Sequence, residues 1–155
     1  VPEAIKKLHD SIQPEIWHQA GRNKVEETEM SYRSCGVDAK ITAFIADMAQ
    51  AYQWADLVIC RAGALTISEL CIAGLGAILV PYPHAVDDHQ TKNAEYLVSA
   101  DAGVMIQQTE LTVEYLEKQI KSVIANLESM AKSAIDCAKL DATECVATKC
   151  IERSL

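Results

Sequence analysis

The residues best suited to chemistry lie in the stretch "CRAGALTISE" (60–69), directly after the apolar run "DLVI". A turn at Gly63 joins a predicted strand to a predicted helix, and glycine lets a backbone turn sharply and approach a ligand closely. The N–H groups of the first helical turn, at Ala64, Leu65 and Thr66, have no partner inside the helix. These donors, together with the positive end of the helix dipole, favour an anion such as a pyrophosphate.

Thr66 and Glu69 also fit a purely structural pattern. T-x-x-E is a capping box, which stabilises a helix start by about 1 kcal/mol. In the alternative interpretation, Glu69 lies one turn further on, on the side that reaches the strand ends. A carboxylate there can accept two hydrogen bonds from the hydroxyls of a ribose. The spacing alone leaves both interpretations open.

A second polar group follows the next predicted strand, in "VPYPHAVDDHQTKNAEYL" (80–97). His89, Gln90 and Asn93 fall in the first turn of a predicted helix, and Gln90 and Asn93 are three apart and share one face. Neutral amides both donate and accept hydrogen bonds, which suits sugar hydroxyls. A solvated helix start is the alternative. Phe44 and Ile45 end another strand, where they could form the wall of a base-binding pocket or simply belong to the core.

No metal site or disulfide framework is expected. His84 and His89 are five residues apart, which matches no standard ligand motif, and no cysteine lies near them. The six cysteines include no C-x-x-C pair, so we expect reduced thiols that fill the core of a cytosolic protein.

Apolar runs of strand length alternate with longer helical patterns along the chain. Strands are predicted at 15–20, 39–44, 56–60, 77–81 and 103–107. Helices are predicted at 22–35, 46–54, 64–73, 89–100, 112–127, 128–139 and 141–153, after an opening helix in "VPEAIKKLHD". This alternation predicts an α/β fold with a Rossmann-like, doubly wound parallel sheet, helices on both faces and ligands at the carboxyl ends of the strands. Because the pattern starts on a helix, we expect the first strand to be missing and the chain to be a fragment.

Composition limits the class of partner. The 155 residues suit one domain with a real core, and the net charge of −8 argues against general nucleic-acid binding. No apolar run is long enough to cross a bilayer, and no signal peptide is seen.

Four stretches together resemble the C-terminal, donor-binding half of the MurG family of GT-B glycosyltransferases. They are "IWHQAG" (16–21), "FIADMAQAYQWADLVICRAGALTISE" (44–69), "VPYPHAVDDHQTKNA" (80–94) and "DAGVMI" (101–106). The resemblance covers nearly the whole chain, 1–155, as a donor domain of a two-domain enzyme. It implies an inverting hexosyltransferase of peptidoglycan synthesis, which moves N-acetylglucosamine (GlcNAc) from UDP-GlcNAc to the muramoyl 4-hydroxyl of lipid I to give lipid II.

The resemblance also implies a role for each site residue. The N–H groups of Ala64, Leu65 and Thr66 would hold the diphosphate, and Glu69 the ribose. The backbone at Phe44 and Ile45 would contact the uracil. Gln90 and Asn93, with His89, would bind the GlcNAc hydroxyls. Arg61 would lie near the phosphates, beside the Gly63 turn.

The family's strand with a GGSxGA loop and its acceptor-binding domain do not match any part of this sequence. The resemblance therefore implies that the catalytic base, lipid I and the cytoplasmic face of the inner membrane are met through the missing half. We expect the fragment alone to be catalytically silent, and the reaction to need no metal or cofactor. Two other functions stay open: the donor-binding subunit of a split GT-B enzyme, and a nonenzymatic nucleotide-sugar-binding domain.

Overall fold

The computed structural model describes residues 1–8 and 12–153, and it is an α/β fold in which every strand pairing is parallel. The strands are β1 (Trp17–Gln19), β2 (Lys40–Thr42), β3 (Leu57–Cys60), β4 (Gly76–Leu79) and β5 (Gly103–Met105). The longer helices are α1 (Pro2–Leu8), α2 (Val25–Cys35), α3 (Met48–Trp54), α4 (Ala64–Ala73), α5 (His89–Val98), α6 (Val113–Ile124), α7 (Leu127–Asp136) and α8 (Ala142–Glu152). Two short 3₁₀ turns, η1 (Val86–Asp88) and η2 (Gln108–Glu110), follow β4 and β5. Each predicted strand and helix is present, with ends that match the prediction or differ from it by up to three residues, and residues 9–10 of the predicted opening helix lie outside the described residues.

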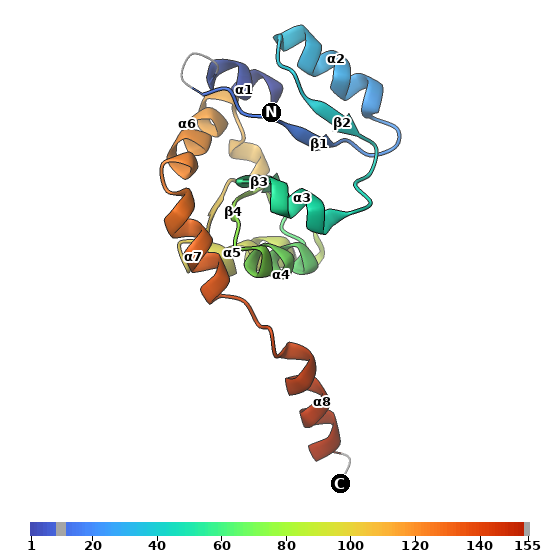
Figure 1. The fold of residues 1–155 in the computed structure, drawn as a ribbon, viewed down its shortest axis with the longest axis vertical. Helices are drawn as coiled ribbons and strands as arrows, with labels where there is room; N and C mark the ends of the chain where they lie inside the picture. The colour runs from blue at the N-terminus through green and yellow to red at the C-terminus, as the bar shows by residue number, and fades with distance from the viewer. Residues whose placement is uncertain (9–11, 154–155) are drawn as a thin grey trace.

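The strands form two sheets instead of the single sheet expected. β1 pairs with β2, and β3, β4 and β5 pair in that order. Within the described residues, no backbone ladder joins β1 or β2 to the other sheet. The predicted parallel α/β class with helices on both faces is confirmed, and within it the strands are hydrogen-bonded as two separate groups. Figure 1 shows the β1–β2 pair with α2 at one end of the body and the three-stranded sheet in its middle.

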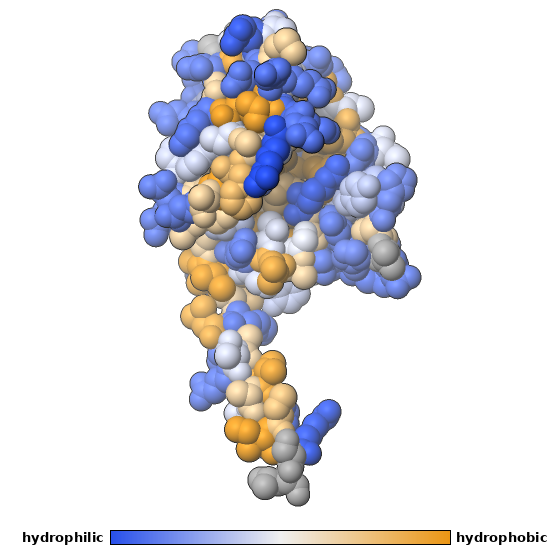
Figure 2. Space-filling view, turned by 90° about the vertical axis from the view of Figure 1, so that its right-hand side faces the viewer, coloured by the Kyte–Doolittle hydropathy of each residue, from blue (hydrophilic) through white to orange (hydrophobic). Residues whose placement is uncertain are grey.

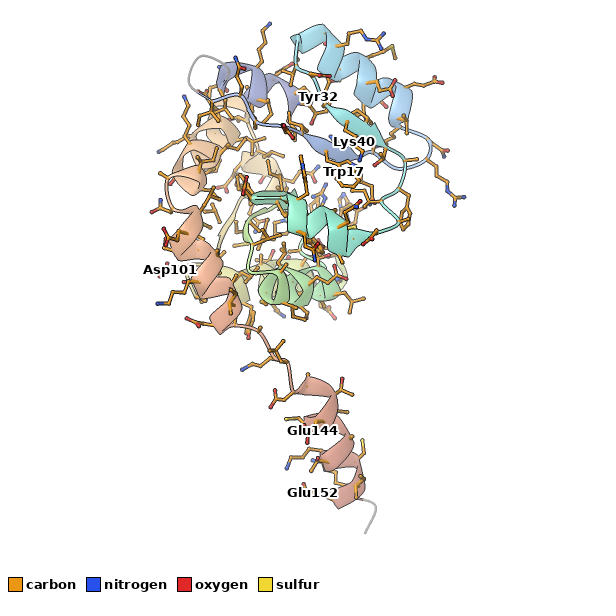
Figure 3. All side chains as sticks on the ribbon, in the orientation of Figure 1. Trp17, Tyr32, Lys40, Asp101, Glu144 and Glu152 are labelled. Carbon is orange, nitrogen blue, oxygen red and sulfur yellow. The ribbon has the colours of Figure 1, made fainter. Side chains whose placement is uncertain are left out.

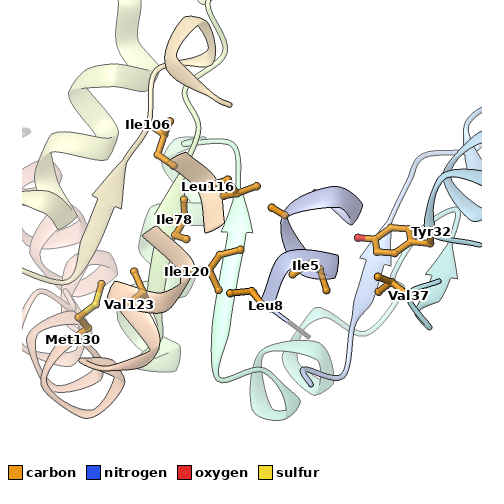
Figure 4. Packing of buried hydrophobic residues seen from close by; sticks show 11 residues of the cluster. Ile5, Leu8, Tyr32, Val37, Ile78, Ile106, Leu116, Ile120, Val123 and Met130 are labelled. Atoms are coloured by element: carbon orange, nitrogen blue, oxygen red, sulfur yellow. The ribbon is translucent and has the colours of Figure 1, made fainter. Parts of the chain in front are cut away.

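Helices cover both faces of the three-stranded sheet, as predicted. β4 is buried along its whole length, so its alternating side chains enter two separate cores. Ile78 packs with α1, α6 and α7, in the cluster that includes Leu8, Ile120 and Val123 (Figure 4). Ala77 and Leu79 face the opposite cluster, which α4 and α5 supply. This double coverage is typical of parallel sheets.

The first sheet is attached to the rest of the molecule by side chains. Lys40 on β2 lies over the ring of Trp17 on β1, with its Nζ 3.5 Å from the ring centroid. Figure 3 shows both residues at the β1–β2 pair. Trp17 also meets Trp54 at the end of α3 edge-on, with ring centroids 5.9 Å apart. Tyr32 of α2 is buried in the same cluster as Ile78, and so joins the two halves of the molecule through one core.

Helix α8 projects from the body and buries none of its residues (Figure 1). Figure 2 shows that its surface mixes apolar and polar residues. The prediction of three closing helices is confirmed in position, but only α6 and α7 pack into the core.

Candidate functional site

The turn between β3 and α4 presents an open helix start at the carboxyl edge of the sheet. Gly63 is the N-cap of α4, and no side chain caps the helix. The first turn of α4 therefore carries the N–H groups of Ala64, Leu65 and Thr66 at its end, and Leu65 is 79% exposed. Gly63 has φ −66° and ψ 146°, backbone angles that any residue can adopt. The prediction that glycine is needed here for a sharp backbone turn is therefore wrong. A Cβ there would meet only the Thr66 hydroxyl, at an ordinary contact distance of 3.4 Å, so the packing of the protein does not itself require glycine at this position.

Glu69 does not belong to a capping box. A capping box needs Thr66 at the N-cap, but the helix starts before Thr66 and its N-cap is Gly63. The Glu69 carboxylate is exposed, and its Oε2 accepts a hydrogen bond from the Tyr52 hydroxyl of α3 at 2.8 Å. The capping interpretation is therefore wrong, and the role of Glu69 at a ribose stays a prediction.

Phe44 and Ile45 have opposite environments. Phe44 is 69% exposed beyond the end of β2, so the expectation that it is a core residue is wrong. Ile45 is buried, and its N–H donates to Oε1 of Gln19 at 2.8 Å. Gln19 ends β1, so its side chain fixes the loop that follows the neighbouring strand. Sequence reasoning did not assign Gln19, although it lies inside the matching stretch 16–21.

Gln90 and Asn93 are both held by the protein. Oε1 of Gln90 accepts from the N–H of Tyr82 at 2.9 Å, and Nδ2 of Asn93 donates to the carbonyl of Ala62 at 3.0 Å. The alternative interpretation, that these two side chains are simply solvated at the start of a helix, is therefore wrong. The remaining amide groups are Nε2 of Gln90, a donor, and Oδ1 of Asn93, an acceptor, a combination that suits hydroxyls. His89 begins α5 beside them and is exposed.

Arg61 is directed to the loops that follow β4 and β5. Its guanidinium donates to the carbonyls of Val80 and Pro81 at 3.1 and 3.0 Å, and to Oε1 of Gln108 at 2.8 Å. It also lies 5.6 Å from the ring centroid of Tyr82. Arg61 thus fixes the exit from β4, and a contact with phosphates stays a prediction.

These contacts join several segments near the carboxyl ends of the strands. Gln19 holds the loop after β2, and Tyr52 of α3 holds Glu69 of α4. Asn93 of α5 holds the turn before α4, and Arg61 holds the loop after β4. Uncapped N–H groups, a carboxylate and two amides thus share one edge, where open α/β sheets bind ligands.

The thiols and possible metal ligands lie outside this arrangement. The six cysteines all lie within the described residues, and none of them forms a disulfide. Cys71 is buried, but Cys145 and Cys150 are exposed because α8 projects from the body, so the expected core-filling role is wrong for both. Burial raises the pKa of the Cys60 thiol to about 12. Among residues 1–8 and 12–153, no group of three or more His, Cys, Asp or Glu is placed to hold a metal ion.

Hydropathy shows no membrane-crossing helix: along the described chain, none is both long enough and apolar enough to span a bilayer.

Comparison with known proteins assigns the chain to a family. The family model described as the glycosyltransferase family 28 C-terminal domain matches residues 1–148. The chain belongs to this family. A family 28 domain with parallel strands and helices on both faces agrees with the fold described above.

Relatives of this family 28 domain are similar over almost its whole length. It is 48% identical, over 98% of the chain, to the UDP-N-acetylglucosamine–N-acetylmuramyl-(pentapeptide) pyrophosphoryl-undecaprenol N-acetylglucosamine transferase of Marinobacter nauticus. The equivalent transferase of Dechloromonas aromatica is 51% identical over 98% of the chain. The chain spans only 43% of the length of each of these relatives.

Solved structures agree with the family assignment. MurG of Acinetobacter baumannii superposes with a TM-score of 0.87 at 41% identity, over 94% of this chain and 44% of that one. The glycotransferase of kitacinnamycin superposes with a TM-score of 0.64 at 18% identity, which shows the shared fold alone.

Proposed function

We propose that this chain is the UDP-GlcNAc-binding domain of an inverting N-acetylglucosaminyltransferase of peptidoglycan synthesis. The whole enzyme would transfer GlcNAc to the muramoyl 4-hydroxyl of lipid I and so form lipid II. The open first turn of α4 carries this proposal, because no side chain occupies the helix end at which an anionic diphosphate would bind. The names of the relatives support the choice of sugar and acceptor.

In the proposed site, the nucleotide lies along the carboxyl edge of both sheets. The N–H groups of Ala64, Leu65 and Thr66 bind the diphosphate, and Glu69 accepts the ribose hydroxyls. The uracil lies at the loop of Phe44 and Ile45, on the far side of α3.

The sugar end of the donor meets α5. Nε2 of Gln90 and Oδ1 of Asn93 bind GlcNAc hydroxyls, with His89 beside them. Gly63 carries no side chain that could narrow the approach of the diphosphate to the start of α4. Arg61 holds the loop after β4 in place near the phosphates.

The chemistry is a displacement at the anomeric carbon. The acceptor oxygen forms a bond to that carbon while the bond to the β-phosphate oxygen breaks, and the electron pair leaves with UDP. The N–H groups of α4 stabilise this developing charge, which is the role of an electrostatic clamp. A base must take the acceptor proton. We assign that base, the lipid I site and contact with the cytoplasmic face of the inner membrane to regions of the relatives that this chain does not match.

Donor binding by the 155-residue chain provides the main test. Calorimetry should show tighter binding of UDP-GlcNAc than of UDP-galactose, with Glu69→Ala weakening UDP-GlcNAc by roughly 10- to 100-fold as a charged hydrogen-bond partner is lost. EDTA should leave binding unchanged, because backbone dipoles supply the positive potential and no metal or cofactor is proposed. Equal binding of both sugar nucleotides, or no effect of Glu69→Ala, would contradict the proposal.

Catalysis provides a second test, which separates the alternatives. The chain alone should transfer no GlcNAc to a lipid I analogue. Activity restored by a separately expressed acceptor-binding chain would favour a split enzyme. Binding without activity in any such combination would favour a nonenzymatic domain.

A further inference from the structure

Tyr52 and Glu69 come from different helices and meet at the candidate site. Tyr52 lies on α3, and its hydroxyl donates to Oε2 of Glu69 on α4 at 2.8 Å. The Tyr52 ring is half-buried and packs on the core cluster beneath α4 and α5. The hydroxyl is therefore held on a fixed ring, whereas the Glu69 side chain is exposed. The rigid Tyr52 ring therefore restrains the flexible Glu69 side chain.

The start of α3 is fixed as well. Asp47 is the N-cap of α3, and its side chain accepts from the N–H of Gln50 at 2.9 Å. Phe44 and Ile45 lie just before this cap, and the Ile45 N–H is bound to Gln19. Helix α3 thus connects the loop proposed for the base to the carboxylate proposed for the ribose.

We propose that Tyr52 is a positioning residue for the nucleoside: it orients the Glu69 carboxylate so that the carboxylate accepts the ribose hydroxyls. This inference rests on the proposed function of the site. A carboxylate offers about four lone-pair positions, and Tyr52 uses one of them on Oε2. Oε1 and the rest of Oε2 remain for the two hydroxyls of a ribose.

The protonation of Tyr52 suits this role. Burial, and then the hydrogen bond to Glu69, raise the pKa of the Tyr52 hydroxyl. The hydroxyl therefore stays a donor at neutral pH. Without it, the exposed Glu69 side chain would have to be ordered at the moment of binding, which costs affinity.

Ribose-dependent binding tests the inference. In calorimetry with UDP, Tyr52→Phe should weaken the affinity of the chain by about three- to tenfold, the cost of ordering one flexible side chain. With 2′,3′-dideoxy-UDP the same substitution should change nothing, because this ligand has no hydroxyls for Glu69 to accept. In a Glu69→Ala background, Tyr52→Phe should also have no further effect on UDP binding. A merely structural role for Tyr52 would weaken both ligands alike.

Tyr96→Phe is a matched control. The Tyr96 hydroxyl donates to the carbonyl of Cys137 at 2.9 Å, between α5 and the end of α7, so its loss removes a comparable hydrogen bond away from Glu69. Tyr96→Phe should leave the affinity for UDP unchanged. Circular dichroism and thermal unfolding show whether each variant is folded. Tyr52→Phe keeps the ring that packs on the core cluster, so we expect it to fold like the parent chain.

The outcomes distinguish the inference from the proposed function. If the parent chain does not bind UDP, both the inference about Tyr52 and the proposed function are contradicted. The inference is contradicted, and the proposed function stands, if Glu69→Ala weakens the binding of UDP but Tyr52→Phe does not. The same holds if Tyr52→Phe weakens the binding of UDP and of dideoxy-UDP equally.

Discussion

Nδ2 of Asn93 lies 3.0 Å from the carbonyl oxygen of Ala62, so one hydrogen bond ties the first turn of α5 to the turn that starts α4. Ala62 is fully buried, so its carbonyl is shielded from solvent and cannot replace this hydrogen bond with one to water if the donor is lost. The amide of Asn93 therefore has two roles for its two polar atoms: its nitrogen fixes the turn that starts α4, and its oxygen remains for the proposed sugar.

Replacing Asn93 should cost both stability and affinity. Asn93→Asp places a carboxylate oxygen against the Ala62 carbonyl, so we expect a loss of about 1–3 kcal/mol in the free energy of unfolding and weaker binding of UDP-GlcNAc. Urea unfolding and calorimetry measure the two effects. Lys92→Ala, at an exposed position one residue earlier, is the control and should change neither. An Asn93→Asp chain as stable as the parent would contradict the structural role.

Substituting Gly63 should separate binding from folding. Its backbone angles suit alanine and a Cβ meets only the Thr66 hydroxyl at 3.4 Å, so Gly63→Ala should change the free energy of unfolding by less than about 1 kcal/mol. The added methyl group narrows the approach to the uncapped N–H groups, so the affinity for UDP should fall.

Gly74→Ala should behave in the opposite way. Gly74 has φ 66° at the end of α4, and a Cβ there would lie 2.8 Å from the Ile135 side chain. This variant should unfold at a lower temperature, while UDP binding at a permissive temperature stays unchanged. Loss of UDP binding in Gly74→Ala, with none in Gly63→Ala, would contradict the assignment of the phosphate site to the start of α4.

Gln19 should matter for recognition of the base. Its side chain accepts the Ile45 N–H at 2.8 Å, so Gln19→Ala frees the loop that carries Phe44. We expect UDP to bind about threefold to tenfold more weakly, and the preference for UDP over CDP to shrink, because the loop must be ordered on binding. Gln50→Ala, an exposed position on α3 whose side chain is not used in the cap, is the control for calorimetry. An unchanged preference in Gln19→Ala would argue against a uracil site at this loop.

Alkaline pH should destabilise the chain through Cys60. Burial raises the pKa of this thiol to about 12 in the folded state, above the value of about 8.5 for a free cysteine. Its contribution is therefore fully present below about pH 8.5 and is lost as pH rises toward 12, because only the unfolded chain then releases the proton. Urea unfolding between pH 8 and 11 should show a shallower loss of stability for Cys60→Ala than for the parent. Cys145→Ala, on the exposed α8, should follow the parent.

The elements of the fold could be predicted from the sequence because their patterns are local. Helix α4 begins at Ala64 and ends at Ala73, as its apolar period and the following glycine indicated. The division of the sheet could not be predicted in this way. Whether β1 pairs with β3 depends on hydrogen bonds between segments distant in sequence, which periodicity does not encode.

The candidate site could be predicted only in part from the sequence, for a related reason. Residue type and spacing selected Glu69, Gln90 and Asn93, but the partners of these side chains depend on how the helices are rotated against one another. Tyr52 carried no signal beyond its place in a matching stretch, because a tyrosine on an amphipathic helix usually indicates packing. The role of Thr66 was also ambiguous, since a capping box requires the helix to begin directly after Thr66, whereas the N-cap of α4 is Gly63, three residues earlier.

The edge-on contact of Trp17 with Trp54 joins the last residue of α3 to the first strand of the smaller sheet. The chain contains only these two tryptophans, so its ultraviolet emission comes almost entirely from the seam between the sheets. A ligand that draws the loop after β2 toward the turn at Gly63 should change the surroundings of both indoles at once. We therefore expect their emission to report binding at the proposed nucleotide site without any label.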